Sequence, residues 1–129
     1  MLEHGAFTFQ INNNIIIFKL TGDFNEYGIK ACLEAEKKAI ESFGKQPCLL
    51  LVDCRAATGA TPEAYQAIND FYRDINYAHL SAIALVYSSD LMARIEERSI
   101  PLMKNHEAKA FLDWQAAIDW LTTKCSKKT

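Results

Sequence analysis

Three short runs of apolar residues constrain the fold of this chain more than any other feature. They are "IIIF" at residues 15–18, "LLLV" at 49–52 and "AIALV" at 82–86. Each has the length of a β-strand and falls far short of the roughly 20 apolar residues that cross a membrane. A strand without polar alternation is covered on both faces, as in sheets whose parallel strands are joined by helices. The runs therefore predict a largely parallel sheet with helices on its faces.

The segments between these runs have the apolar spacing of amphipathic helices. Residues 25–44 place most of their apolar side chains within an arc of about 120°. Glu36 interrupts that arc, and we expect its side chain to reach into solvent. A second helix is predicted to begin after Thr61, which suits an N-cap because Pro62 follows it, and to run to about Tyr77.

The second predicted helix has a wide apolar face, which covers roughly 160° of the helical wheel. A helix that only covers a sheet needs a narrower stripe, so the location where this face is buried bears on function. Its large side chains are Tyr65, Ile68, Phe71, Tyr72 and Ile75.

A third helix is predicted at residues 91–105, and its apolar side chains share an arc of about 120°. Pro101 cannot donate its backbone N–H and crowds the preceding turn, so this helix should kink or end near residues 99 and 100. The methionines suit an apolar surface that repacks against more than one partner. The arc is formed by Leu91, Met92, Ile95, Leu102 and Met103.

The complete order is strand, strand, helix, strand, helix, strand, helix, strand, helix. The first two strands form a hairpin across Asn12–Asn14, and a short strand and a helix at 114–124 close the chain. This order predicts an α/β fold, a mixed five-stranded sheet with four helices, in a single domain over residues 1–129. The predicted core of the sheet contains Ile15, Ile17, Phe18, Leu50, Leu51, Val52, Ile83, Leu85 and Val86.

Composition excludes several functional classes. A net charge of −2 without a basic patch gives no reason to expect a nucleic-acid partner. The start "MLEHGAFTF" lacks the pattern of a signal peptide, and four cysteines without C-x-x-C pairing suit free thiols, so a cytoplasmic protein is expected. The three histidines are scattered along the chain, and we expect no metal and no cofactor.

Chemistry-bearing motifs are sparse. Asp53 follows an apolar run, where open α/β sheets place ligand contacts, but Arg55 two residues later favours a local ion pair. The sequence contains no G-x-G-x-x-G, no G-x-x-x-x-G-K-[ST] and no G-x-S-x-G. We therefore expect a protein that is not an enzyme.

The chain resembles the SpoIIAA-like fold of small bacterial proteins, which STAS domains share with lipid-carrying CRAL-TRIO domains. The stretches that carry the resemblance are "IIIFKLTGDF", "LLLVDCRA", "AIALVYSSD" and "AKAFLDWQAAIDWL". Anti-sigma-factor antagonists of this type have a phosphorylated serine before the second helix. Here the corresponding stretch is "RAATGATPEA", which has no serine, so Thr58 and Thr61 are the phosphorylation candidates.

Two functions remain open at this stage. The first is a noncatalytic module that binds a hydrophobic or lipid-like ligand between the second and third helices, through their ten apolar side chains named above. Reversible attachment to the inner face of the membrane would use the same helices, with Arg73, Arg94, Arg98 and Lys104 facing lipid phosphates. The alternative, implied by the resemblance, is a STAS-type regulatory domain that docks a protein partner through residues 55–61 and the second helix.

Overall fold

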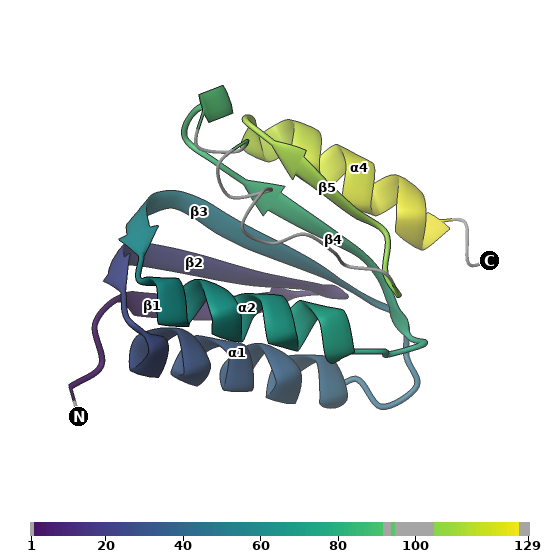
Figure 1. Ribbon diagram of the computed structural model, residues 1–129. Coiled ribbons are helices and arrows are strands. Elements are labelled where there is room, and N and C mark those ends of the chain that lie inside the picture. Colours follow the sequence, from purple (N-terminus) through teal and green to yellow (C-terminus); the bar gives the residue numbers. More distant parts are fainter. Residues whose placement is uncertain (1, 92–93, 95–104, 127–129) are drawn as a thin grey trace.

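A single five-stranded sheet forms the centre of the molecule (Figure 1). The computed structural model describes residues 2–91, 94 and 105–126. The strands lie in the order β1-β2-β3-β4-β5, with β1 antiparallel to β2 and the remaining neighbours parallel, which confirms the predicted mixed sheet. Their bounds are β1 (Ala6–Asn12), β2 (Ile15–Phe24), β3 (Cys48–Ala60), β4 (Leu80–Val86) and β5 (Ala108–Phe111).

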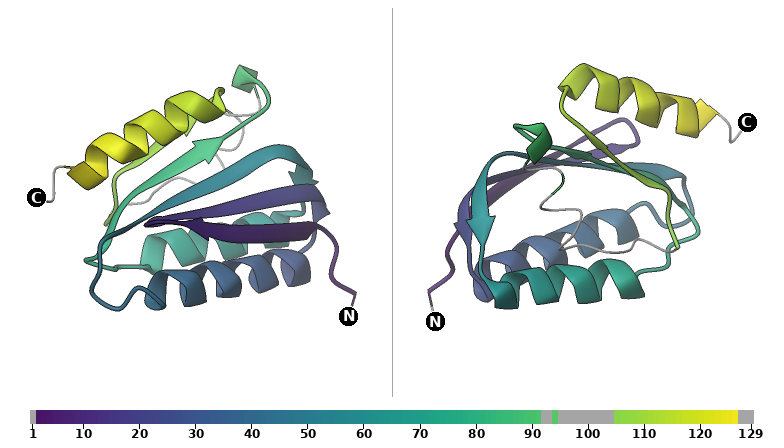
Figure 2. Two further views of the ribbon diagram at one scale, coloured as in Figure 1. Left: turned by 180° about the vertical axis from the view of Figure 1, so that it is seen from behind. Right: turned by 45° about the horizontal axis from the view of Figure 1, so that its top comes forward.

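Helices cover both faces of this sheet. Helices α1 (Glu26–Glu41) and α2 (Pro62–Asp74) lie side by side on one face, and α4 (Trp114–Ser126) lies on the opposite face (Figure 2). The crossovers from β2 to β3 and from β3 to β4 advance in the same direction, and right-handed connections therefore place α1 and α2 on the same face. None of the helices in the described part of the chain is long and apolar enough to cross a membrane.

The prediction of four helices is met only in part, because three helices have bounds within the described residues. The third predicted helix falls mostly outside them. Met92, Ile95, Leu102 and Met103 are not described, and the kink expected at Pro101 stays a prediction. Leu91 is described and is 67 % exposed.

The second helix begins as predicted and ends early. The Thr61 hydroxyl accepts a hydrogen bond from the Ala64 N–H at 3.1 Å, and Pro62 occupies the first turn. The helix ends at Asp74 rather than near Tyr77, because the chain turns extended at Ile75. Tertiary hydrogen bonds hold this extension: Asn105 donates to the Ile75 carbonyl at 3.0 Å, and the Tyr77 N–H donates to His106 Nε2 at 3.2 Å.

The third strand is longer than the apolar run that predicted it. Residues 55–60, which follow that apolar run, continue β3 and pair with the second half of β2. The register shifts where Lys19 pairs with Asp53 and Thr21 pairs with Ala56, so β3 contains an extra residue. Such a bulge reverses the alternation of side chains. Ala57, rather than Ala56, therefore faces the same side as Cys54.

The core divides into one cluster on each face of the sheet. Ile16, Phe18, Leu50 and Val52 face α1 and α2, whereas alternate residues of the same strands face α4. Of the predicted core residues, eight are buried and Ile15, beside the hairpin turn, is half-buried. The cluster on the α4 face contains Ile17, Leu49, Leu51, Ala82, Ala84, Val86, Ala117 and Leu121.

Candidate functional site

A cavity of about 60 Å³ lies between the sheet and the pair of helices α1 and α2. Its walls are mostly apolar: Leu33 comes from α1, Ile68 from α2, and Val52 and Leu85 from the sheet. The continuation of β3 contributes Ala57, Gly59 and Ala60 to the wall. One carboxyl group, that of Glu36, belongs to the wall.

The buried position of Glu36 corrects the expectation that its side chain reaches solvent. Glu36 is 1 % exposed. The Tyr72 hydroxyl donates to its Oε1 at 2.7 Å, and the Cys32 thiol donates to its Oε2 at 3.6 Å. Cys32 lies one helical turn before Glu36 on the buried side of α1, and Tyr72 comes from the neighbouring helix α2. Because α2 packs against α1, the carboxyl group is enclosed between the two helices.

Burial controls the ionisation of this cluster. Desolvation raises the pKa of Glu36 to about 7, although the hydrogen bonds from Tyr72 and Cys32 act in the opposite direction. Burial and the neighbouring carboxyl group raise the pKa of Tyr72 well above its ordinary value and raise that of Cys32 as well. No ion pair joins Glu36 to a basic side chain among the described residues.

The structure brings together some of the predicted ligand-binding residues and separates others. Tyr65, Ile68 and Tyr72 line the cavity. Phe71 packs edge-on against Tyr72, with ring centroids 5.1 Å apart, and borders an outer groove with Ile75 instead. The cavity formed by described residues lies between α1, α2 and the sheet. The cleft predicted between the second and third helices involves residues outside the described part of the chain and stays a prediction.

Sequence reasoning missed Glu36 and Cys32. The available signal was a carboxyl residue in the middle of an apolar arc, four residues after a cysteine on the same side of the helix. That pattern is compatible with a long side chain bending out to solvent, so the apolar spacing alone does not distinguish the two cases. The hydrogen-bond partner that accompanies the inward orientation of Glu36 is Tyr72, which is 36 residues away in the sequence.

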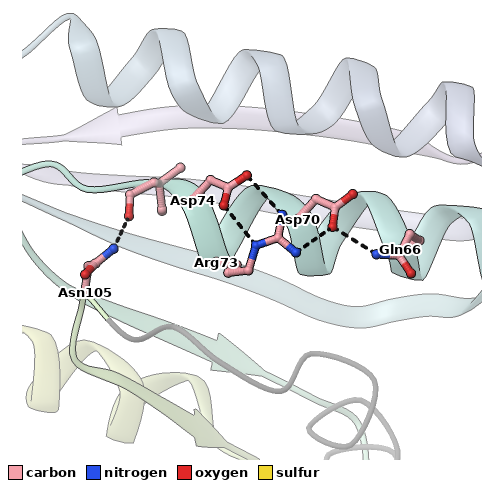
Figure 3. Close-up of polar contacts among 6 residues, drawn as sticks. Gln66, Asp70, Arg73, Asp74 and Asn105 are labelled. Carbon is pink, nitrogen blue, oxygen red and sulfur yellow. Dashed lines mark hydrogen bonds and ion pairs between the residues drawn. The ribbon is translucent and has the colours of Figure 1, made fainter.

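The solvent face of α2 carries its own network of polar contacts (Figure 3). Arg73 forms ion pairs with Asp70 at 3.1 Å and with Asp74 at 2.9 Å, and Gln66 donates to Asp70 at 2.9 Å. Arg94 pairs with Asp90 at 2.9 Å. The two arginines that are described among the four predicted phosphate contacts are therefore each paired with aspartate.

The two phosphorylation candidates occupy different environments. Thr61 is half-buried and its hydroxyl is used as the N-cap of α2. Thr58 is exposed near the end of β3, and its hydroxyl donates to the carboxylate of Asp23 on β2. Thr58 is consequently the more accessible of the two hydroxyls.

Asp53 forms the local ion pair that the sequence predicted. Both of its oxygens accept hydrogen bonds from the Arg55 guanidinium at 2.9 Å, and that guanidinium lies 5.4 Å from the ring centroid of Trp114. Burial by itself would raise the pKa of Asp53, but the bonds from Arg55 hold it below the ordinary value. In the part of the chain that is described, no group of His, Cys, Asp and Glu side chains is arranged to hold a metal ion.

Comparison with known proteins identifies the family. A family model described as SpoIIAA-like matches residues 15–122. The chain belongs to the SpoIIAA-like family. This confirms the resemblance drawn from the strand and helix patterns.

Solved structures share the fold of this SpoIIAA-like chain. An uncharacterized protein of the DUF3478 family from Shewanella loihica PV-4, with a SpoIIAA-like fold, superposes with a TM-score of 0.66 at 17% identity, over 94% of this chain and 96% of that one. The anti-sigma factor antagonist SpoIIAA in its unphosphorylated form gives 0.61 at 11% identity, over 91% and 98%. An anti-sigma factor antagonist from Mycobacterium paratuberculosis gives 0.59 at 7% identity, over 92% and 94%. No curated protein sequence matches the chain.

Identities this low establish a common fold, and one fold hosts many functions. The SpoIIAA-like chain therefore has the architecture on which anti-sigma factor antagonists are built. The function of this chain has to be argued from the geometry and chemistry of the site.

Proposed function

We propose that this SpoIIAA-like chain is a noncatalytic binding domain that holds a small, mostly apolar molecule in the cavity between α1, α2 and the sheet. The observation that carries the proposal is an apolar cavity with one carboxyl group in its wall. Apolar walls with a small number of placed polar groups are typical of small-molecule sites. A buried acid whose pKa is displaced by desolvation is also a marker of functional sites.

The volume of the cavity limits the size of the ligand. A cavity of roughly 150 Å³ admits benzene, and the volume here is about 60 Å³. A long-chain lipid would need several times this space, which would require α2 to move away from the sheet. Because the arginines described on the predicted membrane face are already paired with aspartates, we do not extend the proposal to a membrane surface.

A matched pair of variants tests the proposal. Ala57 lines the cavity, whereas Ala56 is exposed and does not line it. Ala57→Leu should fill the cavity and Ala56→Leu should leave it open. Xenon binds empty apolar cavities, so NMR spectra under xenon should show shifts at Leu33 and Ile68 in the parent chain and in A56L but not in A57L.

The same variants test for a natural ligand. Native mass spectrometry of protein purified from its own host should detect a small molecule on the parent chain and on A56L, and not on A57L. If xenon leaves the cavity residues unshifted and no molecule co-purifies with the parent chain, the proposal is wrong.

The second candidate function is a regulatory domain that docks a protein partner, and the exposure of Thr58 favours it. A phosphate on Thr58 would stand beside the Asp23 carboxylate, to which the hydroxyl now donates, and repulsion would separate β3 from β2 at this end. A phosphothreonine at position 58, found by mass spectrometry of protein from its host, would place this function above ligand binding. Unmodified protein from cells under several growth conditions would remove its main support.

A further inference from the structure

The Glu36 carboxyl group has unused capacity to accept hydrogen bonds. A carboxylate offers about four lone-pair positions on its two oxygens. The Tyr72 hydroxyl uses one position on Oε1 at 2.7 Å, and the Cys32 thiol, a weak donor, uses one on Oε2 at 3.6 Å. Both oxygens can therefore accept a further hydrogen bond from a molecule in the cavity that Glu36 lines.

Within the described part of the chain, the groups that surround Glu36 supply no positive charge. Helix α1 contributes Cys32 and α2 contributes Tyr72, while Cys54 of β3 is near enough to interact electrostatically with both. None of these side chains is a cation. Burial of a carboxylate costs free energy unless a cation or several hydrogen-bond donors compensate it. The site therefore supplies the anion of an ion pair, and none of the described side chains around it supplies the cation.

We propose that the ligand of this cavity is a short apolar molecule with a protonated amine head, and that Glu36 is its counter-ion. The inference rests on the proposed ligand-binding function and specifies the charge of the ligand. An ammonium group brings three donors and the missing positive charge. Tyr65 and Tyr87 also line the cavity, and aromatic rings attract cations. A carboxylate ligand would be repelled by Glu36.

The cavity volume sets the length of the apolar part. One water needs roughly 10–15 Å³ of such space, so a cavity of about 60 Å³ accommodates about four to six non-hydrogen atoms without movement of the helices. A branched four-carbon amine is therefore the appropriate probe. Isobutylamine, isobutanol and isobutyrate have the same branched carbon skeleton and differ in the head group, so they separate charge from shape.

The test is an NMR titration of the full chain with each of the three probes at pH 8. Isobutylamine should shift the signals of Leu33, Glu36 and Ile68 and should bind at least about tenfold more tightly than isobutanol. Isobutyrate should not bind. Glu36→Gln should lose the tenfold preference and keep the affinity for isobutanol, whereas Glu34→Gln, an exposed position on the same helix, should behave as the parent chain.

The affinity for the amine should also depend on pH. Because burial raises the pKa of Glu36 to about 7, the amine must displace a proton in more acidic solution. Its affinity should rise about tenfold between pH 6 and pH 8, while the affinity for isobutanol stays constant. The tyrosine and thiol that contact Glu36 keep their protons over this range, since the pKa of each is raised.

The outcomes separate this inference from the function on which it rests. If isobutanol binds in the cavity as tightly as isobutylamine, or if isobutyrate binds, the ligand-binding function stands and the assignment of an amine is wrong. If no probe shifts the cavity residues, and xenon does not either, the ligand-binding function itself fails. Should E36Q not fold, Tyr72→Phe replaces it: losing a hydrogen bond that lowers the pKa of Glu36 should move the rise in amine affinity to higher pH, and an unmoved rise would overturn the role of Glu36.

Discussion

The face of the sheet beneath α4 and the face beneath α1 and α2 bury side chains of different sizes. Against α4 the sheet presents Ala82 and Ala84, and the helix meets it with Ala117. Against α1 and α2 it presents larger residues, among them Phe18 and Leu50, and a cavity of about 60 Å³ lies within that layer. Small side chains let a helix approach closely, whereas bulky side chains from two layers leave gaps where their shapes do not match. The α4 face is therefore closely packed, whereas the α1–α2 face contains the cavity to which we attribute the proposed binding function.

The largest expected effect is on the α4 face. Leu121 is fully buried there, so Leu121→Ala should lower the free energy of unfolding by about 3 kcal/mol, from lost burial and from the new cavity. Urea denaturation measures this loss. A loss below about 1 kcal/mol would show that the α4 face is loosely packed and would remove the contrast between the faces.

The next effect is specific to the α1–α2 face and depends on pH. The unfolded chain ionises Glu36 near its ordinary value of 4.5, whereas the folded chain keeps the proton to about pH 7. The folded state thus binds more protons between these values, and its stability falls as pH rises through them, by roughly 3 kcal/mol in all.

Comparison with Glu36→Gln isolates this contribution. The parent chain should lose about 3 kcal/mol relative to E36Q between pH 4.5 and pH 8, as measured by urea denaturation at each pH. The comparison with E36Q is needed because burial also lowers the pKa of His106, and the titration of that side chain makes the stability of both proteins rise with pH. A pH-independent difference between E36Q and the parent chain would contradict the burial of an ionisable Glu36.

A third pair of variants compares the free space on the two faces. Ala84→Val adds volume to a fully buried position on the α4 face and should cost about 2 kcal/mol. Ala57→Val adds the same volume beside the cavity and should cost almost nothing. Thermal melts of both variants are sufficient for the comparison. Equal losses would mean that the cavity is not accessible to side chains from β3.

The smallest expected effect concerns the start of α2, the helix that closes the cavity. Thr61→Ala removes the acceptor of the Ala64 N–H and should cost about 1 kcal/mol. Thr61→Ser keeps a hydroxyl in the same position and should restore most of this stability. A T61S variant as unstable as T61A would show that the threonine methyl group, rather than the cap, matters at this position.

Local patterns were sufficient for the elements that depend on near neighbours. The three central strands and the start of α2 were predicted from solid apolar runs and from the pair Thr61-Pro62. The end of α2 was not, because Asn105 and His106 hold the chain extended after Ile75. The continuation of β3 was also missed, because its residues are paired by β2 and "RAATGA" has the composition of a loop.

The sequence by itself determined the fold class, since apolar periodicity is a local property that every strand and helix displays, and it carried the resemblance to the SpoIIAA-like family that the family model confirmed. It also placed Tyr65, Ile68 and Tyr72 on one apolar face of α2. Only the tertiary structure decided what that face contacts. It turned Glu36 inward to the Tyr72 hydroxyl and set the cavity between α1, α2 and the sheet. The physical reason is that the burial of a carboxyl group depends on a partner 36 residues away, and helix periodicity does not specify which helices become neighbours.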